Sequence, residues 1–251
     1  MEDKNYRERI DILGVPIDRV DMEMALEIFE ELLASPGCSL IVTPNSEIIT
    51  VAEKDPAFKD VILSADLVIP DGIGLVYASH LLRKPLKQRV TGIDFLERAL
   101  SRLATTGQSV YFLGGKPGVA VKAATAMEAK YPGLVVAGAA DGYFDPMREE
   151  EVVEMINASG AVLLCVALGA PKQEFFIARN KTRLAVNTAV GVGGSFDVFS
   201  GEVKRAPRFY REHGLEWLYR LAQQPARIKR AAALPRFMVM ILLGRGKADR
   251  R

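Results

Sequence analysis

The chain alternates between short apolar runs and longer segments in which apolar residues recur every three or four positions. Apolar runs of about four to eight residues indicate strands, and the longer periodicity indicates helices. We therefore expect strands at residues 9–15, 39–42, 67–69, 109–113, 134–137, 161–168 and 184–191. We expect helices at residues 22–33, 46–53, 72–82, 92–105, 118–131, 149–158 and 171–179.

This strand–helix alternation predicts an α/β fold, a Rossmann-like and mostly parallel sheet with helices on both faces. The runs at 110–115 and 161–169 are continuously apolar, as expected for central strands buried on both sides. In such sheets ligands collect beyond the carboxyl ends of the strands. The turns that follow the strands are therefore the candidate site, and they lie at residues 43–45, 70–72, 114–116, 169–173 and 193–195.

The pattern changes after Gly201, where prolines punctuate the chain. Because proline is tolerated in the first turn of a helix but not in its interior, we predict three short helices, at residues 214–223, 225–233 and 235–243. We divide the chain into a core of residues 1–203 and a helical appendage of residues 204–251.

The core and the appendage also differ in net charge. The appendage carries thirteen Lys and Arg residues against three acidic ones, a net charge of +10, although the whole chain carries only +2. Residues 1–203 therefore carry −8. A basic segment on an acidic body indicates an anionic partner, which is a membrane surface, a nucleic acid or a phosphorylated substrate. The appendage has no recognised nucleic-acid-binding motif, so we do not expect a nucleic acid partner.

Two further patterns concern the membrane. The longest apolar run of the appendage, residues 237–244, is far shorter than the ~20 residues of a spanning helix. The first fifteen residues lack the basic and apolar regions of a signal peptide. We therefore expect a protein that lies on a membrane surface without crossing it.

Composition bears on metals and cofactors. Cys38 and Cys165 lie in strand-like apolar runs and are expected to be buried thiols. With two histidines and no DxD sequence, we predict no bound metal and no cofactor. The glycine-rich turn at 114–118 resembles a phosphate-binding turn but matches neither GxGxxG nor the P-loop. A dinucleotide-dependent oxidoreductase is therefore the alternative from a different class of protein, and it lacks a clear ribose-binding acid.

Three residues carry specific chemistry. Asp71, between a strand and a helix, suits either a helix cap or a general base for an acceptor hydroxyl. Arg89 precedes another helix start and suits a phosphate group, although an exposed cation is the plainer interpretation. Lys172 lies in a first helical turn, where a cation is disfavoured; exposure to solvent can account for it, but a bound anion explains it better.

The turns together form a recognisable series. In order they read TPN at 43–45, PDG at 70–72, RVTGID at 89–94, FLGGKPG at 112–118, DGYF at 141–144, GAPKQE at 169–174, GVGGSFDVFSG at 191–201 and GLEWLYRL at 214–221. This series resembles the WecG/TagA/CpsF family of glycosyltransferases over nearly the whole chain.

The resemblance implies an inverting, metal-independent glycosyltransferase that uses UDP-sugars, in the best-known branch UDP-N-acetylmannosamine (UDP-ManNAc). Its acceptor would be N-acetylglucosamine linked to a polyprenyl diphosphate, in wall teichoic acid or related surface polysaccharide synthesis. Other branches use other sugars, so UDP-ManNAcA or a UDP-hexose is the alternative donor. The resemblance further implies a cytoplasmic protein bound peripherally to the anionic inner face of the cell membrane. A homo-oligomer of the core is left open.

The resemblance also assigns residues. It makes Asp71 the base, and it places four matching residues in the substrate pocket: Thr43, Asn45, Arg89 and Gln173. Three appendage arginines would close over the diphosphates: Arg220, Arg227 and Arg230. From the remaining turns we add four substrate-binding candidates: Gly114, Gly115, Lys172 and Asp197.

Overall fold

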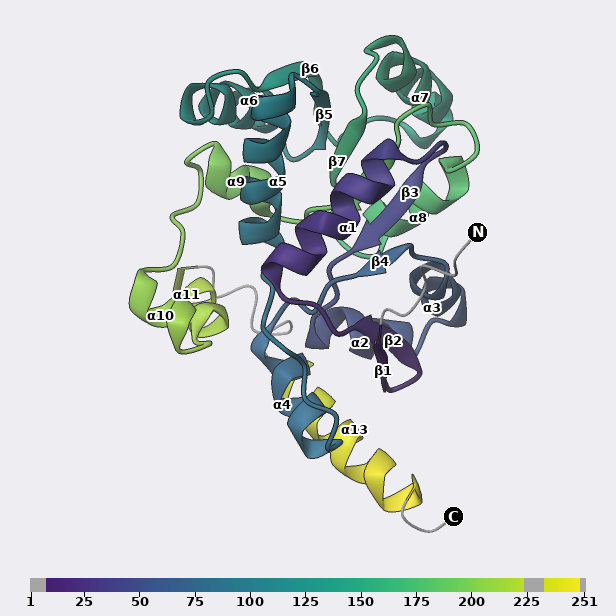
Figure 1. The fold of residues 1–251 in the computed structure, drawn as a ribbon, viewed down its shortest axis with the longest axis vertical. Coiled ribbons are helices and arrows are strands. Elements are labelled where there is room, and N and C mark those ends of the chain that lie inside the picture. Colours follow the sequence, from purple (N-terminus) through teal and green to yellow (C-terminus); the bar gives the residue numbers. More distant parts are fainter. Residues whose placement is uncertain (1–7, 224–232, 249–251) are drawn as a thin grey trace.

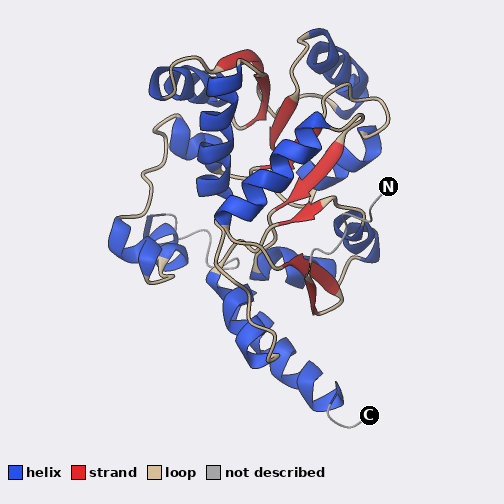
Figure 2. Ribbon diagram, in the orientation of Figure 1, coloured by secondary structure: helices blue, strands red, loops and turns tan. Residues whose placement is uncertain are grey.

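A parallel sheet with helices on both faces forms the body of the computed structural model, which describes residues 8–223 and 233–248 (Figures 1 and 2). Six of the described strands form this sheet in the order β4-β3-β8-β7-β5-β6. Their bounds are β3 Ser39–Val42, β4 Leu67–Val68, β5 Ser109–Gly114, β6 Val135–Ala140, β7 Leu163–Ala167 and β8 Thr188–Gly191. Every residue of the central strands β3, β8 and β7 is buried. The predicted α/β fold is confirmed.

The helices form two layers. Their bounds are α1 Met22–Ala34, α2 Ser46–Ala52, α3 Pro56–Leu63, α4 Ile73–Leu81, α5 Gly92–Thr106, α6 Val119–Lys130, α7 Glu149–Ala158, α8 Lys172–Asn180, α9 Ser195–Phe199, α10 Arg208–Glu212, α11 Glu216–Gln223 and α13 Ala233–Ala248, with a 3₁₀ turn at Pro146–Arg148. Helices α1, α5, α6 and α9 share one apolar core cluster, and α2, α3, α7 and α8 share another. The two clusters lie on opposite faces of the sheet (Figure 1).

Aromatic side chains hold these layers together. On one face, Phe112 of β5 stacks on Phe196 of α9 with ring centroids 4.6 Å apart. On the other, Phe58 of α3 packs against Phe175 of α8 at 5.7 Å. Such contacts add to the free energy gained by burying the rings. The first contact joins α9, which follows β8, to the sheet, and the second joins α8, which follows β7, to α3. Cys165 is a buried free thiol within β7, as predicted.

The N-terminal strand prediction was wrong. Residues 9–15 form parts of two strands, β1 Arg9–Ile12 and β2 Val15–Asp18, which pair as an antiparallel hairpin outside the main sheet. The turn between them, Leu13 and Gly14, has φ values of 56° and 75°. Two-residue hairpin turns require such left-handed residues. Leucine rarely occupies this conformation, so an apolar run that contains Leu13 did not indicate a turn.

Three short helices of the described chain were also missed, α3, α9 and the five-residue α10. Helix α3 begins after Asp55, whose side chain accepts a hydrogen bond from the Phe58 amide at 3.1 Å, and Pro56 occupies its first turn. This is a strong N-terminal signal for a helix. Helix α9 has only five residues and follows two glycines, so it was too short to show periodicity.

The appendage contains α10, α11 and α13, and the predicted helix at 225–233 lies almost wholly outside the described residues. Helix α13 runs beside α4 and packs against α2 (Figure 1). It buries Phe237 and Ile241 in the core cluster that contains α2. The appendage therefore contributes core side chains as well as charge. No helix of the described chain is both long enough and apolar enough to span a membrane.

Candidate active site

Three chain segments meet at the carboxyl ends of β3 and β4. The amide of Asp71, after β4, donates to the carbonyl of Pro44, after β3, at 3.0 Å. The amide of Val90, in the loop before α5, donates to the carbonyl of Pro70 at 3.1 Å. These backbone hydrogen bonds hold the TPN, PDG and RVTGID motifs side by side.

Two glycines allow this close approach. Gly72 has φ +102°, and a Cβ atom at this position would lie 3.1 Å from Cβ of Asn45. A Cβ at Gly92 would lie 3.1 Å from Oγ1 of Thr43. The side chains of Thr43 and Asn45 therefore pack directly against glycine backbone, which explains why the motifs carry glycine at these two positions.

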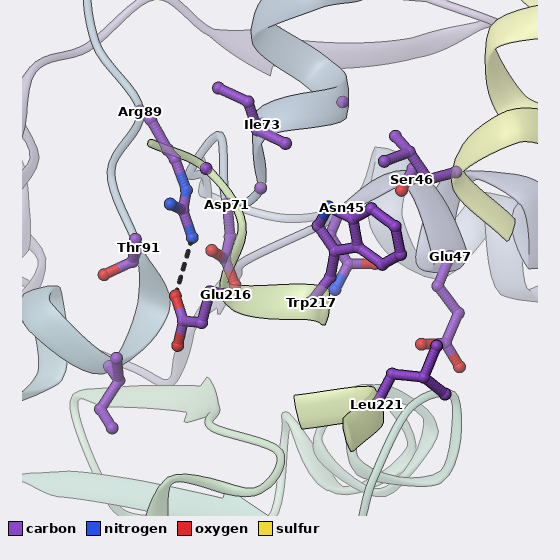
Figure 3. Close-up of a pocket in the computed structure, with 15 residues that line it drawn as sticks. Asn45, Ser46, Glu47, Asp71, Ile73, Arg89, Thr91, Glu216, Trp217 and Leu221 are labelled. Carbon is purple, nitrogen blue, oxygen red and sulfur yellow. Dashed lines mark hydrogen bonds and ion pairs between the residues drawn. The ribbon is translucent and has the colours of Figure 1, made fainter. Parts of the chain in front are cut away.

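A cavity of about 190 Å³ opens where the three motifs meet (Figure 3). Its lining includes Asn45, Ser46, Glu47, Asp71, Arg89, Thr91, Glu216, Trp217 and Leu221. The structure thus brings together Asn45, Asp71 and Arg89, which the sequence predicted as site residues. Helix α11 of the appendage contributes Glu216, Trp217 and Leu221 to the wall.

Asp71 does not occupy the cap position of the helix that follows it. Helix α4 has Gly72 as its N-cap, with no side-chain hydrogen bond at the cap. Asp71 stands one residue earlier, half-buried at the cavity wall. A carboxylate at the wall of a cavity can accept a proton from a hydroxyl that enters it.

Asn45 combines a structural role with a free donor. Its Oδ1 accepts a hydrogen bond from the Ile48 amide at 3.0 Å and caps α2. This bond fixes the orientation of the side-chain amide, because Oδ1 must face the helix. The Nδ2 group is then the part of Asn45 that can donate to a ligand in the cavity.

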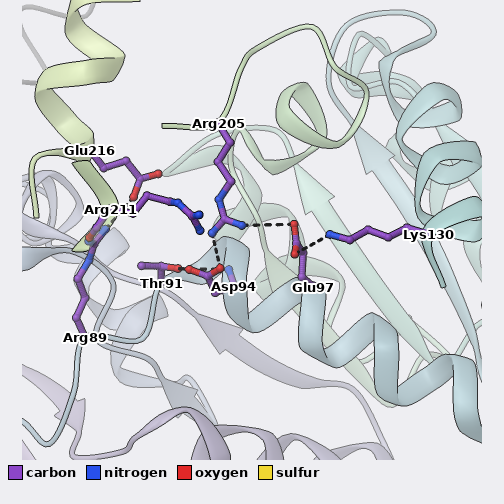
Figure 4. Close-up of polar contacts among 8 residues, drawn as sticks. All are labelled: Arg89, Thr91, Asp94, Glu97, Lys130, Arg205, Arg211 and Glu216. Atoms are coloured by element: carbon purple, nitrogen blue, oxygen red, sulfur yellow. Dashed lines mark hydrogen bonds and ion pairs between the residues drawn. The ribbon is translucent and has the colours of Figure 1, made fainter. Parts of the chain in front are cut away.

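Arg89 binds the appendage. Its Nη2 donates to Oε2 of Glu216 at 3.0 Å, and its Nη1 donates to the carbonyl of Arg211 at 3.2 Å (Figures 3 and 4). Its Nε is buried and has no acceptor among the described residues. The residue predicted to meet a phosphate therefore holds a carboxylate of the protein itself.

Gln173 lies outside this cavity, at the ends of β7 and β8. It is 3% exposed. Its Nε2 donates to Oε1 of Glu174 at 2.8 Å, and its Oε1 accepts from the Gly193 amide at 3.1 Å. Gln173 thereby links the turn after β7 to the turn after β8. Burial raises the pKa of Glu174 above its usual range. Lys172, beside them, is exposed.

The glycine-rich turn after β5 is also away from the cavity. The Gly115 amide donates a hydrogen bond to the carbonyl of Ala167 at 3.0 Å, so this amide is already used within the protein backbone. A Cβ at Gly114 would lie 2.5 Å from the Ala167 backbone, which explains the glycine there. Asp197 is half-buried in α9. The structure leaves the substrate-binding roles of Gly114, Gly115 and Asp197 as predictions.

The three appendage arginines are placed only in part. Arg220 lies in α11, but its side chain is not described. Arg227 and Arg230 lie outside the described residues. Their predicted contacts with diphosphates stay predictions.

Sequence reasoning missed Glu216 and Trp217 as cavity residues. Both belong to the GLEWLYRL motif, but we treated this segment as an apolar and basic helix. Glu216 is one of three acidic residues in an appendage of net charge +10, and this rarity was the available signal. Within residues 8–223 and 233–248, no three His, Cys, Asp or Glu side chains gather closely enough to hold a metal ion.

Comparison with known proteins gives a consistent result. The family model described as "Glycosyl transferase WecG/TagA/CpsF family" matches residues 10–251. An N-acetylglucosaminyldiphosphoundecaprenol N-acetyl-beta-D-mannosaminyltransferase of Bacillus spizizenii is 41% identical over 204 residues, 81% of this chain and 79% of the relative. The Staphylococcus aureus protein of the same name is 33% identical over 249 residues, 98% of this chain and 97% of the relative.

Among solved structures, a nicotinate phosphoribosyltransferase from Vibrio cholerae aligns with 78% of this chain and 48% of its own, at 12% identity and a TM-score of 0.22. A likeness this weak carries no information about fold or function.

Proposed function

The chain belongs to the WecG/TagA/CpsF family of glycosyl transferases, and on this basis we propose that it transfers N-acetylmannosamine from UDP-ManNAc to N-acetylglucosaminyldiphosphoundecaprenol. Two relatives carry names for transfer to this acceptor. The observation that supports the proposal most directly is the cavity that gathers Asn45, Asp71 and Arg89 under α11. By its family resemblance, the product would enter wall teichoic acid or a related surface polysaccharide.

The proposed reaction is a single displacement with inversion. Asp71 takes the proton of the acceptor hydroxyl as its oxygen attacks the anomeric carbon of the donor sugar. The bond from that carbon to the UDP oxygen breaks on the opposite face, and UDP leaves. By analogy with glycoside cleavage, the transition state has oxocarbenium character. Asp71 ends the step protonated and returns its proton to solvent.

The leaving diphosphate gains negative charge in this step. We propose that arginines meet this charge in place of a metal, with Arg89 at the cavity wall and Arg220, Arg227 and Arg230 from the appendage. Guanidinium groups form bidentate hydrogen bonds to phosphate and are always charged, so they suit this role. Turnover in excess EDTA should then equal turnover without it, and a loss restored by Mg²⁺ or Mn²⁺ would refute this part of the proposal.

We also propose that the protein binds the anionic inner face of the cell membrane. The appendage has a net charge of +10, and each basic residue near an anionic lipid surface contributes about 1 kcal/mol. Large apolar side chains are exposed on α11 and α13: Trp217, Leu218, Val239, Leu242 and Leu243. Such residues can insert shallowly at the interface. Sedimentation with anionic vesicles should fall when Leu242 and Leu243 are changed to serine, and equal sedimentation would contradict this proposal.

The transfer assay distinguishes the candidate donors. Purified protein is mixed with a polyprenyl-diphosphate-linked N-acetylglucosamine and, in separate reactions, UDP-ManNAc, UDP-ManNAcA, UDP-N-acetylglucosamine or a UDP-hexose. UDP release and the product mass are measured. We expect release and a product heavier by one N-acetylhexosamine with UDP-ManNAc. Product with another sugar alone would change the donor, and no release with any UDP-sugar would refute the proposed function.

A further inference from the structure

A second cavity, of about 650 Å³, adjoins the Asp71 cavity. It lies between the loop that precedes α5 and helix α10 of the appendage, and Arg89 and Thr91 line both cavities. Arg208 and Arg211 of α10 complete a group of three lining arginines. Three guanidinium groups thus lie at one cavity, next to the candidate base.

The three arginines differ in how well they are paired. The side chain of Arg208 is 82% exposed and pairs with Glu212 in its own helix at 2.5 Å. Arg89 and Arg211, by contrast, each have a buried Nε with no acceptor in the part of the chain that the structure describes. Native proteins rarely leave a buried charged donor without an acceptor. Arg205 has such an Nε too, but it lines neither cavity and its Nη groups pair with Asp94 and Glu97. Arg89 and Arg211 therefore bring to one cavity two guanidinium groups whose Nε donors no described residue uses.

Asp94, an acidic residue of the core that lines the second cavity, is not the missing acceptor. Asp94 accepts hydrogen bonds from Arg205 and from Thr91, one to each carboxylate oxygen (Figure 4). Arg205 also pairs with Glu97 at 3.6 Å, and Glu97 with Lys130 at 2.9 Å. Both oxygens of Asp94 are therefore engaged by other donors, and among the described residues its carboxylate accepts no hydrogen bond from Nε of Arg211.

Glu216 is the anion that Arg89 does hold. Its carboxylate lies in the Asp71 cavity and binds Nη2 of Arg89, which stands between the two cavities. A carboxylate and a phosphate present similar oxygen pairs to a guanidinium group. Glu216 thus occupies a position on Arg89 that a phosphate oxygen can take instead.

We propose that the second cavity is a phosphate-binding subsite in which Arg89 and Arg211 hold a substrate diphosphate. Glu216 is the internal carboxylate that this diphosphate displaces from Arg89. The choice of a diphosphate as ligand rests on the proposed function, whereas the pairing of the arginines does not. The diphosphate is either that of UDP or that of the prenyl-linked acceptor, and both present the same oxygens.

The test is calorimetric titration of the full-length protein with inorganic pyrophosphate. Arg211→Gln should weaken binding by about tenfold or more, because a charged hydrogen bond is lost. Arg211→Lys should weaken it as well, since lysine keeps the charge but lacks the planar guanidinium group. Arg148→Gln, which removes an exposed arginine paired with Glu151, should leave binding within twofold of wild type. Thermal unfolding verifies that each variant is folded.

A matched pair of variants tests displacement. Glu216→Gln and Glu212→Gln each remove one negative charge from the same region, but only Glu216 binds Arg89. Glu216→Gln should bind pyrophosphate at least threefold more tightly than Glu212→Gln, because the internal competitor is gone. Equal affinity of these two variants, or wild-type affinity of Arg211→Gln, would overturn the proposal.

Competition identifies the source of the diphosphate. If saturating UDP blocks pyrophosphate, the subsite holds the donor diphosphate. If pyrophosphate still binds while UDP is saturating, and a short prenyl diphosphate blocks it, the subsite holds the acceptor diphosphate. Either result supports the subsite. The predicted binding without any sugar transfer would refute the proposed function alone, and transfer with unaltered binding by Arg211→Gln would refute the subsite alone.

Discussion

Arg89 and Glu216 are 127 residues apart in the sequence, yet their side chains form an ion pair of 3.0 Å at the wall of the Asp71 cavity. The pair joins the loop before α5 to α11 of the appendage. A partly buried ion pair gains little net stability, because desolvation offsets the attraction. Its main consequence is positional, since it holds α11 at the Asp71 cavity until, as we propose, a diphosphate takes the place of Glu216 on Arg89.

Replacing Arg89 should reduce turnover. Arg89→Gln removes the guanidinium group at the cavity wall while keeping a side chain of similar length. We expect kcat/KM for the UDP-sugar to fall about tenfold to a hundredfold, the usual worth of a charged hydrogen bond. Arg98→Gln is the matched control, because Arg98 is exposed and pairs only with Glu23 among the described residues. Similar kinetics for the two variants would remove Arg89 from the active site.

The network around Asp94 predicts a pH dependence of stability. Burial alone would raise the pKa of Asp94, but hydrogen bonds from Arg205 and Thr91 and the charges of Arg205 and Arg211 hold this pKa below its usual 3.8. A group whose pKa is lower when folded stabilises the protein above the unfolded value, and this contribution is lost as pH falls through the folded value.

The variant Asp94→Asn isolates this contribution. At pH 7 its Tm should be lower than that of wild type. The difference should shrink progressively once the pH falls below about 3.8. Thermal unfolding between pH 7 and pH 2 measures it, and a Tm difference that stays constant over this range would contradict the assignment.

Helix α13 should contribute to stability through Phe237. This side chain is fully buried, and Phe→Ala changes in cores cost about 3–5 kcal/mol. Leu243→Ala, on the same helix but 68% exposed, should change the free energy of unfolding by about 0.5 kcal/mol or less. Urea unfolding of both variants provides the measurement. Equal and small effects would mean that α13 does not pack as described.

Gly72 should be needed for the site rather than for the fold alone. Gly72→Ala places a methyl group 3.1 Å from Cβ of Asn45, in a backbone with φ +102°. Gly37 also has a positive φ, +83°, but a Cβ there meets no atom within 4 Å. Both alanine variants should lose about 1 kcal/mol of stability from backbone strain. Only Gly72→Ala should also lower kcat by tenfold or more, and equal kcat values would contradict the role of this close approach.

Local sequence patterns predicted much of the fold. The alternation of apolar runs and helical periodicity gave the strands of the main sheet and the longer helices, because both depend on neighbouring residues. It failed at Leu13, where an apolar residue forms a hairpin turn, and at the five-residue helix α9. In the hairpin, Gly14 was a turn signal but it lay within an apolar run, and α9 is too short to show helical periodicity.

The site was predictable where it follows strand ends. Asn45 and Asp71 come together because neighbouring parallel strands end at the same edge of the sheet. The pairing of Glu216 with Arg89 was not predictable in this way, since no local pattern connects residues 127 positions apart. Such contacts depend on how the appendage packs, which only the structure shows.

The central claim is that Asp71 is the base of a sugar transfer in this cavity. The most direct test measures kcat for transfer and the Kd for UDP with Asp71→Asn beside wild type, and with Asp60→Asn as a control on an exposed aspartate of α3. We expect Asp71→Asn to lower kcat by about 10²–10⁴, as expected for a lost general base, while the Kd for UDP stays within about threefold. If Asp71→Asn keeps more than about a third of wild-type turnover, a threshold far above any such loss, Asp71 is not the base.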